Sequence, residues 1–289
     1  MNTGLQQSGL PRTEPEPATP PQAMLPMKGR ILGVDVSMTR YDEAVGAITA
    51  AATAKRALSV SALAVHGVMT GVLDAAHRWR LNRLDMVVPD GQPVRWALNL
   101  LYGAKLSDRV NGPALTLKVC EAAAALGLPV YFYGSRPEVL EKLTQRLARK
   151  YPGLQVAGAR PSLFRKCTDA ERLAIIGEIR DSGARIVFVG LGCPRQEVWT
   201  YENAEAIGVP VIAVGAAFDF HAGLLPQAPV VLQDKGLEWA YRLYQEPRRL
   251  WRRYLLLNPL YISLFLLQWS GLSRFADAGQ KPSGMEYYA

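Results

Sequence analysis

The sequence predicts an α/β protein whose core is an open, mostly parallel sheet flanked by helices, a Rossmann-like pattern. Short β-rich runs alternate with longer amphipathic stretches along most of the chain, which is typical of this class. The 289 residues are 49% hydrophobic and 20% charged, a composition that suits one folded domain with a small extension. We therefore expect one α/β core rather than two full domains.

The expected elements follow one another from residue 30 onward. Short apolar runs predict strands at 30–36, 58–64, 86–88, 130–133, 155–159, 185–190 and 211–214. Amphipathic periodicity predicts helices between them, notably at 40–54, 67–80, 113–126, 137–150, 170–182 and 195–206. Together these elements make up one Rossmann-like domain at 28–236, which we expect to be the catalytic domain.

The two ends of the chain differ from this core. Residues 1–27 contain six prolines and little apolar periodicity, so we expect a disordered leader, and its start lacks the pattern of a secretory signal. Residues 237–270 mix arginines with Trp, Tyr and Leu, and the 16-residue run at 254–269 is shorter than the roughly 20 residues that cross a bilayer. We expect this appendage to lie on a membrane and residues 271–289 to form a flexible tail.

Net charge and cysteines limit the partners. The charge of +8 and the pI near 9.5 favour an anionic partner, which could be nucleic acid, a phospholipid surface or a phosphorylated substrate. Cys120, Cys167 and Cys193 are widely spaced and form no CxxC pair, which argues against a disulfide framework and a zinc knuckle. We expect reduced thiols and no metal site.

Asp90 is the leading candidate for a catalytic base. It follows the apolar strand MVV and Pro89 and precedes Gly91, so its carboxylate should lie at the carboxyl end of a strand, where ligands of such sheets bind. A carboxylate there can take a proton from a substrate hydroxyl. The alternative is a turn aspartate that bonds to its own backbone.

The loop VGLGCPRQE at 189–197 is a glycine-rich turn that leads into a helix. Backbone N–H groups and the helix dipole can hold a diphosphate at such a place. The candidate contacts to a diphosphate-bearing donor substrate are Gly190, Gly192 and Gln196. The loop has neither the GxGxxG spacing of dinucleotide sites nor the ending of a P-loop. An ordinary strand-to-helix turn is the alternative.

Two further loops carry polar groups toward helix starts. In FYGSRPE, Gly134 permits a turn and Arg136 can meet a phosphate or simply be exposed. In DRVNGP, Arg109 and Asn111 precede a helix with Pro113 near its start, where one of them could hold a leaving diphosphate.

Three more candidates are less specific. Asp219 and His221 lie between glycines in GAAFDFHAG, where they can face a substrate or tie the loop. His66 follows the strand run VSALAV, and its imidazole can act as a base or donor or be structural.

The basic residues of the appendage complete the candidates. With Trp239 and Trp251 beside them, they suit anionic headgroups, or alternatively a solvated helix packed on its own domain. They are Arg242, Arg248, Arg249, Arg252 and Arg253.

Taken together, PDGQP, RVNGP, FYGSRPE, VGLGCPRQE, GAAFDFHAG and QEPRRLWRRY resemble the bacterial WecG/TagA/CpsF glycosyltransferase family, also called glycosyltransferase family 26, over residues 30–268. The resemblance implies a GT-E type of Rossmann-like fold and inverting, metal-independent transfer without a cofactor. It also implies a nucleotide-sugar donor and an acceptor sugar on undecaprenyl diphosphate. It matches Asp90 to the family's base, Arg109 to its arginine and Gln196 to its glutamine. The appendage corresponds to the part that closes the site and contacts the membrane.

One departure bears on the donor. Many members carry a TxNxE-like stretch after the second strand, whereas this chain has ALAVH, with Ala62 and Ala64 at the polar positions and His66 as a replacement contact. This form is similar to the exopolysaccharide branch, which implies glucosyl transfer from UDP-glucose to a lipid-linked saccharide. Transfer of N-acetylmannosamine or its uronic acid to lipid-linked N-acetylglucosamine is the alternative.

The resemblance also sets location and partners. It implies a cytoplasmic enzyme bound peripherally to the inner face of the cytoplasmic membrane, with no nucleic acid partner and with a homo-oligomer left open. Two rivals of other classes are a nicotinamide oxidoreductase, although no GxGxxG follows the first strand, and a non-catalytic membrane-surface adaptor.

Overall fold

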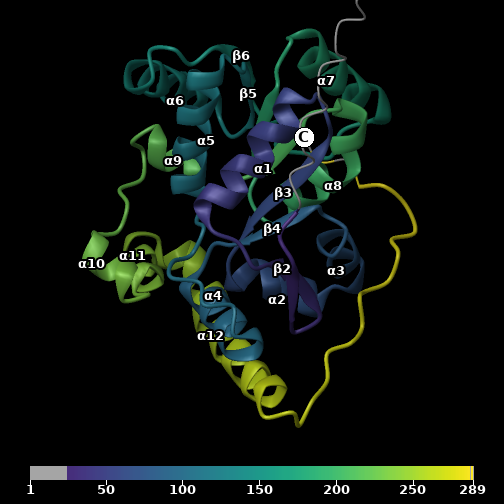
Figure 1. The fold of residues 1–289 in the computed structure, drawn as a ribbon, viewed down its shortest axis with the longest axis vertical. Helices are drawn as coiled ribbons and strands as arrows, with labels where there is room; N and C mark the ends of the chain where they lie inside the picture. The colour runs from purple at the N-terminus through teal and green to yellow at the C-terminus, as the bar shows by residue number, and fades with distance from the viewer. Residues whose placement is uncertain (1–24, 287, 289) are drawn as a thin grey trace, which may run out of the picture.

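The computed structural model describes residues 25–286 and 288, so the expected leader lies outside the described residues apart from 25–27. A six-stranded sheet with parallel pairing throughout forms the centre of the molecule, in the order β4-β3-β8-β7-β5-β6 (Figure 1). Its strands are β3 Leu58–Leu63, β4 Met86–Pro89, β5 Val130–Gly134, β6 Val156–Arg160, β7 Ile186–Gly190 and β8 Pro210–Ala213. The predicted Rossmann-like α/β fold is confirmed.

Alternating strand residues send apolar side chains into helices on the two faces of the sheet. Ile186 and Phe188 of β7 pack into the cluster formed with α1 Tyr41–Thr53, α5 Gly112–Leu126 and α6 Pro137–Lys150. Their neighbours Val187 and Val189 pack instead with α7 Asp169–Asp181 and α8 Arg195–Ile207. This two-sided burial explains why the central strands are apolar throughout.

The expected strand at 30–36 is wrong. The chain forms an antiparallel hairpin there, with β1 Lys28–Ile31 paired to β2 Val34–Ser37. Leu32 and Gly33 adopt positive φ values of 51° and 86°, which is the backbone of a two-residue hairpin turn. The apolar residues before and after the turn resemble one continuous strand in the sequence, and only Gly33 marks the reversal.

The expected helix at 67–80 is divided in two. α2 Val65–Leu73 ends at Asp74, and α3 Ala75–Leu81 begins after it. The Asp74 carboxylate accepts hydrogen bonds from the N–H groups of Ala76 and His77, at 2.8 and 3.0 Å, so it caps the second helix. A further helix, α4 Gln92–Tyr102, follows the loop of Asp90.

The C-terminal part is helical. Its elements are α9 Ala217–His221, α10 Val230–Asp234, α11 Glu238–Gln245 and α12 Pro247–Trp269. α12 packs against α2 and α4, with Tyr261 buried and its hydroxyl donating to the Pro93 carbonyl at 3.2 Å. Among the described residues, no helix is both long and apolar enough to cross a membrane.

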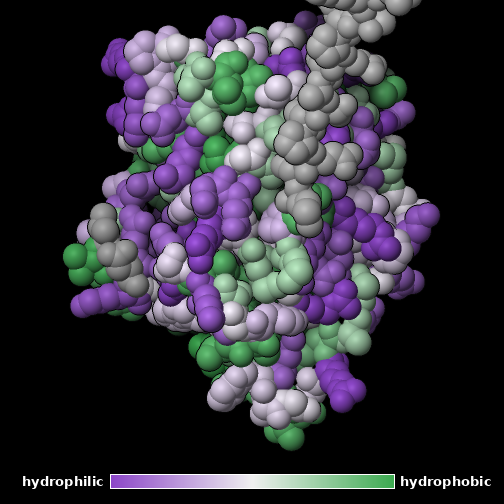
Figure 2. All heavy atoms as spheres, viewed as in Figure 1, coloured by the Kyte–Doolittle hydropathy of each residue, from purple (hydrophilic) through white to green (hydrophobic). Residues whose placement is uncertain are grey.

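Much of the apolar surface of α12 faces outward. Figure 2 shows apolar side chains gathered at the lower end of the molecule, where α12 lies in Figure 1. The large exposed apolar residues of this helix are Trp251, Leu255, Leu256, Leu260, Ile262, Leu266, Leu267 and Trp269. A face of this kind is unusual for a helix surrounded only by water.

The segment after α12, expected to be a flexible tail, contacts α3 and its C-terminal end. Asp277 pairs with Arg78 at 2.6 Å, and Glu286 lies 3.3 Å from Arg80. The Asn82 side chain also donates to the Ala278 carbonyl at 3.2 Å. In Figure 1 the yellow segment runs without helices from the end of α12 back past α3.

Candidate active site

The loops after β3, β4 and β8 meet closely at the carboxyl edge of the sheet. A Cβ atom added at Gly112, at the start of α5, would lie 2.6 Å from the Val214 carbonyl oxygen and 3.4 Å from the Ala62 side chain. One added at Gly91 would lie 3.6 Å from Ala64. Small residues therefore let α5 and the loop of Asp90 approach the ends of the central strands.

Asp90 lies at this junction and is held by its surroundings. Its N–H donates to the Leu63 carbonyl at 3.2 Å, and its carboxylate accepts from the Gly112 N–H. Burial raises the pKa of Asp90 to about 6, against the attraction of Arg109, and the charge of Glu238 adds to the rise. The group is thus ionised at neutral pH but more basic than an exposed carboxylate.

Arg109 links the C-terminal helices α10 and α11 to the junction that contains Asp90. Its side chain is 8% exposed, and its Nη2 donates to Glu238 Oε2 at 2.5 Å and to Gln233 Oε1 at 3.3 Å. Glu238 belongs to α11 and Gln233 to α10. An anionic ligand that binds Arg109 must therefore compete with the Glu238 carboxylate.

The sequence did not reveal three members of this site. They are Tyr41, Gln233 and Glu238. The Tyr41 hydroxyl accepts from the Asn111 N–H at 3.0 Å, and burial raises the pKa of Tyr41 to about 12. Tyr41 and Asn111 are 70 residues apart, and Arg109 and Glu238 are 129 apart. No local pattern indicates such pairs, because only the folded chain brings them together.

The glycines that end β5 and β7 form a second junction on the same edge. Gly134 has a φ of 112°, and a Cβ added there would lie 2.8 Å from the Gly190 carbonyl carbon. One added at Gly190 would lie 2.6 Å from the Phe218 ring. These positions require glycine because backbone and ring occupy the space of a side chain.

Gln196 ties the loops of the second junction. Its Oε1 accepts from the N–H groups of Gly192 and Gly215, at 3.2 and 3.1 Å. Its Nε2 donates to Glu197 Oε1 at 2.8 Å, and the whole residue is 1% exposed. The structure therefore places this predicted donor contact in an internal network, which also contains Gly215, a residue not predicted from the sequence.

Two other predicted residues make contacts within the protein. The Asn111 side chain accepts from the Ala114 N–H at 2.8 Å and so caps α5. His221 Nε2 lies 2.9 Å from the Pro113 carbonyl, and burial lowers the pKa of His221. The neutral ring thus joins α9 to α5 as a donor.

The remaining single residues lie at the ends or starts of elements. Arg136 is exposed at the start of α6, and Asp219 is half-buried within α9. His66 is half-buried in the first turn of α2, directly after β3.

The predicted arginines divide into two groups. Arg242 lowers the pKa of Asp90 and lies 5.5 Å from the centre of the Phe220 ring, so it belongs to the first junction. Arg248 and Arg252 are exposed, and Arg252 lies 5.3 Å from the centre of the Trp251 ring. The side chains of Arg249 and Arg253 lie outside the described part of the structure.

A sequence profile described as the Glycosyl transferase WecG/TagA/CpsF family matches residues 29–274, which include the sheet, both junctions and α12. The chain belongs to the WecG/TagA/CpsF family. The predicted membership and the general role of a glycosyltransferase are confirmed. In this glycosyltransferase, the first junction combines a carboxylate of raised basicity with two arginines, the groups that removal of a proton and stabilisation of a leaving anion require.

Proposed function

We propose that this glycosyltransferase moves glucose from UDP-glucose to a saccharide carried on polyprenyl diphosphate, with inversion at the anomeric carbon and without a catalytic metal. The placement of Asp90 is the observation that supports this most directly. Its carboxylate lies at the carboxyl edge of a parallel sheet, with a pKa raised to about 6 and with Arg109 and Arg242 close enough to affect it.

Asp90 acts as the general base in this proposal. Its carboxylate takes the proton of the acceptor hydroxyl while that oxygen forms a bond to the anomeric carbon. The bond from the anomeric carbon to the diphosphate breaks on the opposite face, and the diphosphate leaves with the bonding electron pair. A single displacement of this kind inverts the configuration.

Arg109 and Arg242 stabilise the charge that develops on the leaving diphosphate. Arg109 is preorganised, because its side chain is buried and fixed by Glu238 and Gln233. The Gly192 N–H already donates a hydrogen bond to Gln196. We therefore assign that loop the role of shaping the binding site of the nucleotide sugar, and not that of supplying every hydrogen bond to the diphosphate.

The small residues at the end of β3 support a donor other than N-acetylmannosamine. Ala62 and Ala64 place methyl groups against Gly112 and Gly91, where a TxNxE-like stretch would place polar side chains. His66, in the next turn, supplies a replacement contact. Glucose fits this change, since it lacks the acetamido group that a polar pair could recognise.

The C-terminal helices support work at the inner face of the cytoplasmic membrane. α12 exposes several large apolar side chains together with Arg248 and Arg252. Apolar and basic residues on one helix bind anionic interfaces, where the lipid-linked acceptor resides. The adjoining α11 carries Glu238, which contacts Arg109, so membrane contact and the site are close in the chain.

The test is transfer of radiolabelled sugar to a glucosyl diphosphate lipid. UDP-glucose and UDP-N-acetylmannosamine are compared as donors, with and without added Mg²⁺, for the wild type, Asp90→Asn and Asp181→Asn. Asp181 is exposed at the end of α7 and serves as the matched control. We expect glucose transfer by wild type and control alone, independent of Mg²⁺.

Other outcomes separate the alternatives. Transfer of N-acetylmannosamine would replace the proposed donor, and equal transfer by Asp90→Asn would remove Asp90 from the chemistry. Polysaccharide synthesis in cells that is untouched by Asp90→Asn would favour the adaptor.

A further inference from the structure

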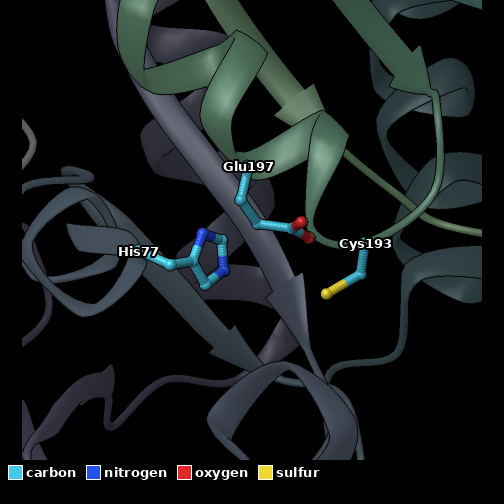
Figure 3. Close-up of side chains that lie close together, drawn as sticks. All are labelled: His77, Cys193 and Glu197. Carbon is cyan, nitrogen blue, oxygen red and sulfur yellow. The ribbon is translucent and has the colours of Figure 1, made fainter. Parts of the chain in front are cut away.

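Three potential metal ligands lie close together beside the glycine-rich loop that precedes α8. His77 comes from α3, Cys193 from the loop after β7, and Glu197 from the first turn of α8. Their ligand atoms all lie within 4.8 Å of one another. Figure 3 shows the imidazole, the carboxylate and the sulfur turned toward a common space.

Two of the three residues are buried, Cys193 is half-buried, and the cluster is incompletely hydrogen-bonded. His77 and Glu197 are each 1% exposed. Among the residues that the structure describes, neither ring nitrogen of His77 has a hydrogen-bond partner and Glu197 Oε2 has none, although Glu197 Oε1 accepts from Ser61 and Gln196. Buried polar atoms are almost always satisfied, so an unsatisfied ring nitrogen of His77 and an unsatisfied Glu197 oxygen within one cluster indicate a missing ligand.

The chemistry of the three groups selects the ligand. A neutral imidazole coordinates a metal ion through a ring nitrogen lone pair, and His77 is buried with its ring beside Cys193 and Glu197. A thiol, an imidazole and a carboxylate together suit Zn²⁺, a borderline-soft ion that takes nitrogen, sulfur and oxygen ligands.

Charge balance points the same way. A thiolate and a carboxylate together neutralise a divalent cation, which suits a site removed from solvent. The nearby cation Arg80 is already paired with Glu202 at 3.0 Å and Glu286 at 3.3 Å.

We propose that His77, Cys193 and Glu197 bind a structural zinc ion, with a water molecule completing four coordination positions. Cys193 binds the ion as a thiolate, and its proton is released to solvent. The ion fixes α3 to the loop of Gly192 and to the start of α8, which carries Gln196. It takes no part in the proposed transfer reaction, and this proposal does not depend on that reaction.

The experiment measures zinc retained by the purified full-length chain. The protein is stripped with EDTA, equilibrated with excess ZnCl₂, desalted and analysed for metal content. We expect one equivalent of zinc per wild-type chain and loss of most of it in His77→Gln and Cys193→Ser. Cys167→Ser is the matched control, because Cys167 is a buried thiol outside the cluster, and it should retain the full equivalent.

Cobalt provides a second measurement that needs no disruptive variant. Co²⁺ bound to a thiolate gives a near-ultraviolet charge-transfer band, which we expect in the wild type and Cys167→Ser but not in Cys193→Ser. Circular dichroism checks that the variants are folded. A wild type that retains no zinc and shows no cobalt band overturns the proposal, as does equal zinc retention by Cys193→Ser.

Discussion

Two junctions at the carboxyl edge of one sheet use their polar groups in different ways. Around Asp90, burial raises the pKa of the carboxyl to about 6, and nearby charges from two other segments, the loop of Arg109 and α11, act on it. At the second junction, the Gln196 amide is buried and is hydrogen-bonded to Gly192, Gly215 and Glu197. The first junction holds charges whose state can change, whereas the second holds loops in place.

This difference predicts which substitutions affect chemistry and which affect stability. A reactive group is costly to the fold, because its charge lacks full solvation. A satisfied internal amide stabilises the fold and acts on substrate only through the loops it positions.

The largest expected effect belongs to Asp90→Asn. We expect kcat/KM for transfer to fall about 10²- to 10⁴-fold, since an amide cannot take the acceptor proton. The melting temperature should stay the same or rise, because the amide can still accept from the Gly112 N–H and carries no charge to desolvate. Calorimetry and transfer assays check both, with Asp181→Asn as control. A variant that loses activity together with its fold would break the comparison.

Gln196→Ala should act mainly on stability. It removes the acceptor of two loop N–H groups and the donor to Glu197, which should lower the free energy of unfolding by about 2 kcal/mol. Urea denaturation measures this change. A variant of unchanged stability that binds the nucleotide-sugar donor far more weakly would assign Gln196 a direct contact with the donor instead.

Asn111→Ala tests a residue that was predicted to contact substrate and that caps α5 in the structure. Loss of the cap on α5 should lower the free energy of unfolding by about 1 kcal/mol, with little change in kcat/KM for the folded enzyme. Asn111→Ser, which can also cap the helix, should recover most of the stability in the same denaturation assay. A large fall in kcat/KM in both variants would instead indicate contact with substrate.

Glu238→Gln should give the smallest effect, a shift in the pH profile. The Glu238 charge raises the pKa of Asp90, so its removal lets that carboxylate ionise at lower pH. Since the ionised form is the base, the acid limb of kcat/KM should move to lower pH. Glu205→Gln, an exposed change on α8, should leave the limb in place. A shift to higher pH would contradict the assignment of Asp90 as the base.

The sequence predicted the site better at some positions than at others. Asp90 was identified from a motif that follows a strand and Arg109 from a motif that precedes a helix, and in the structure the charge of Arg109 acts on Asp90. Gln196 was identified as important, but its motif could not show that its amide faces inward. The cluster of His77, Cys193 and Glu197 was not predicted, because its histidine lies on a helix far from the other two in the chain.

The sequence by itself determined the α/β class, the order of most elements and the family, because hydrophobic periodicity and local motifs are encoded within a few tens of residues. Local turn residues determine the hairpin of β1 and β2 and the division of the expected helix at Asp74. The apolar pattern alone indicated neither of them. Only the tertiary structure decided that Glu238 meets Arg109, that Tyr41 meets Asn111, and that α12 packs on α2 and α4. These contacts join distant segments, and packing of the whole chain selects them rather than any local preference.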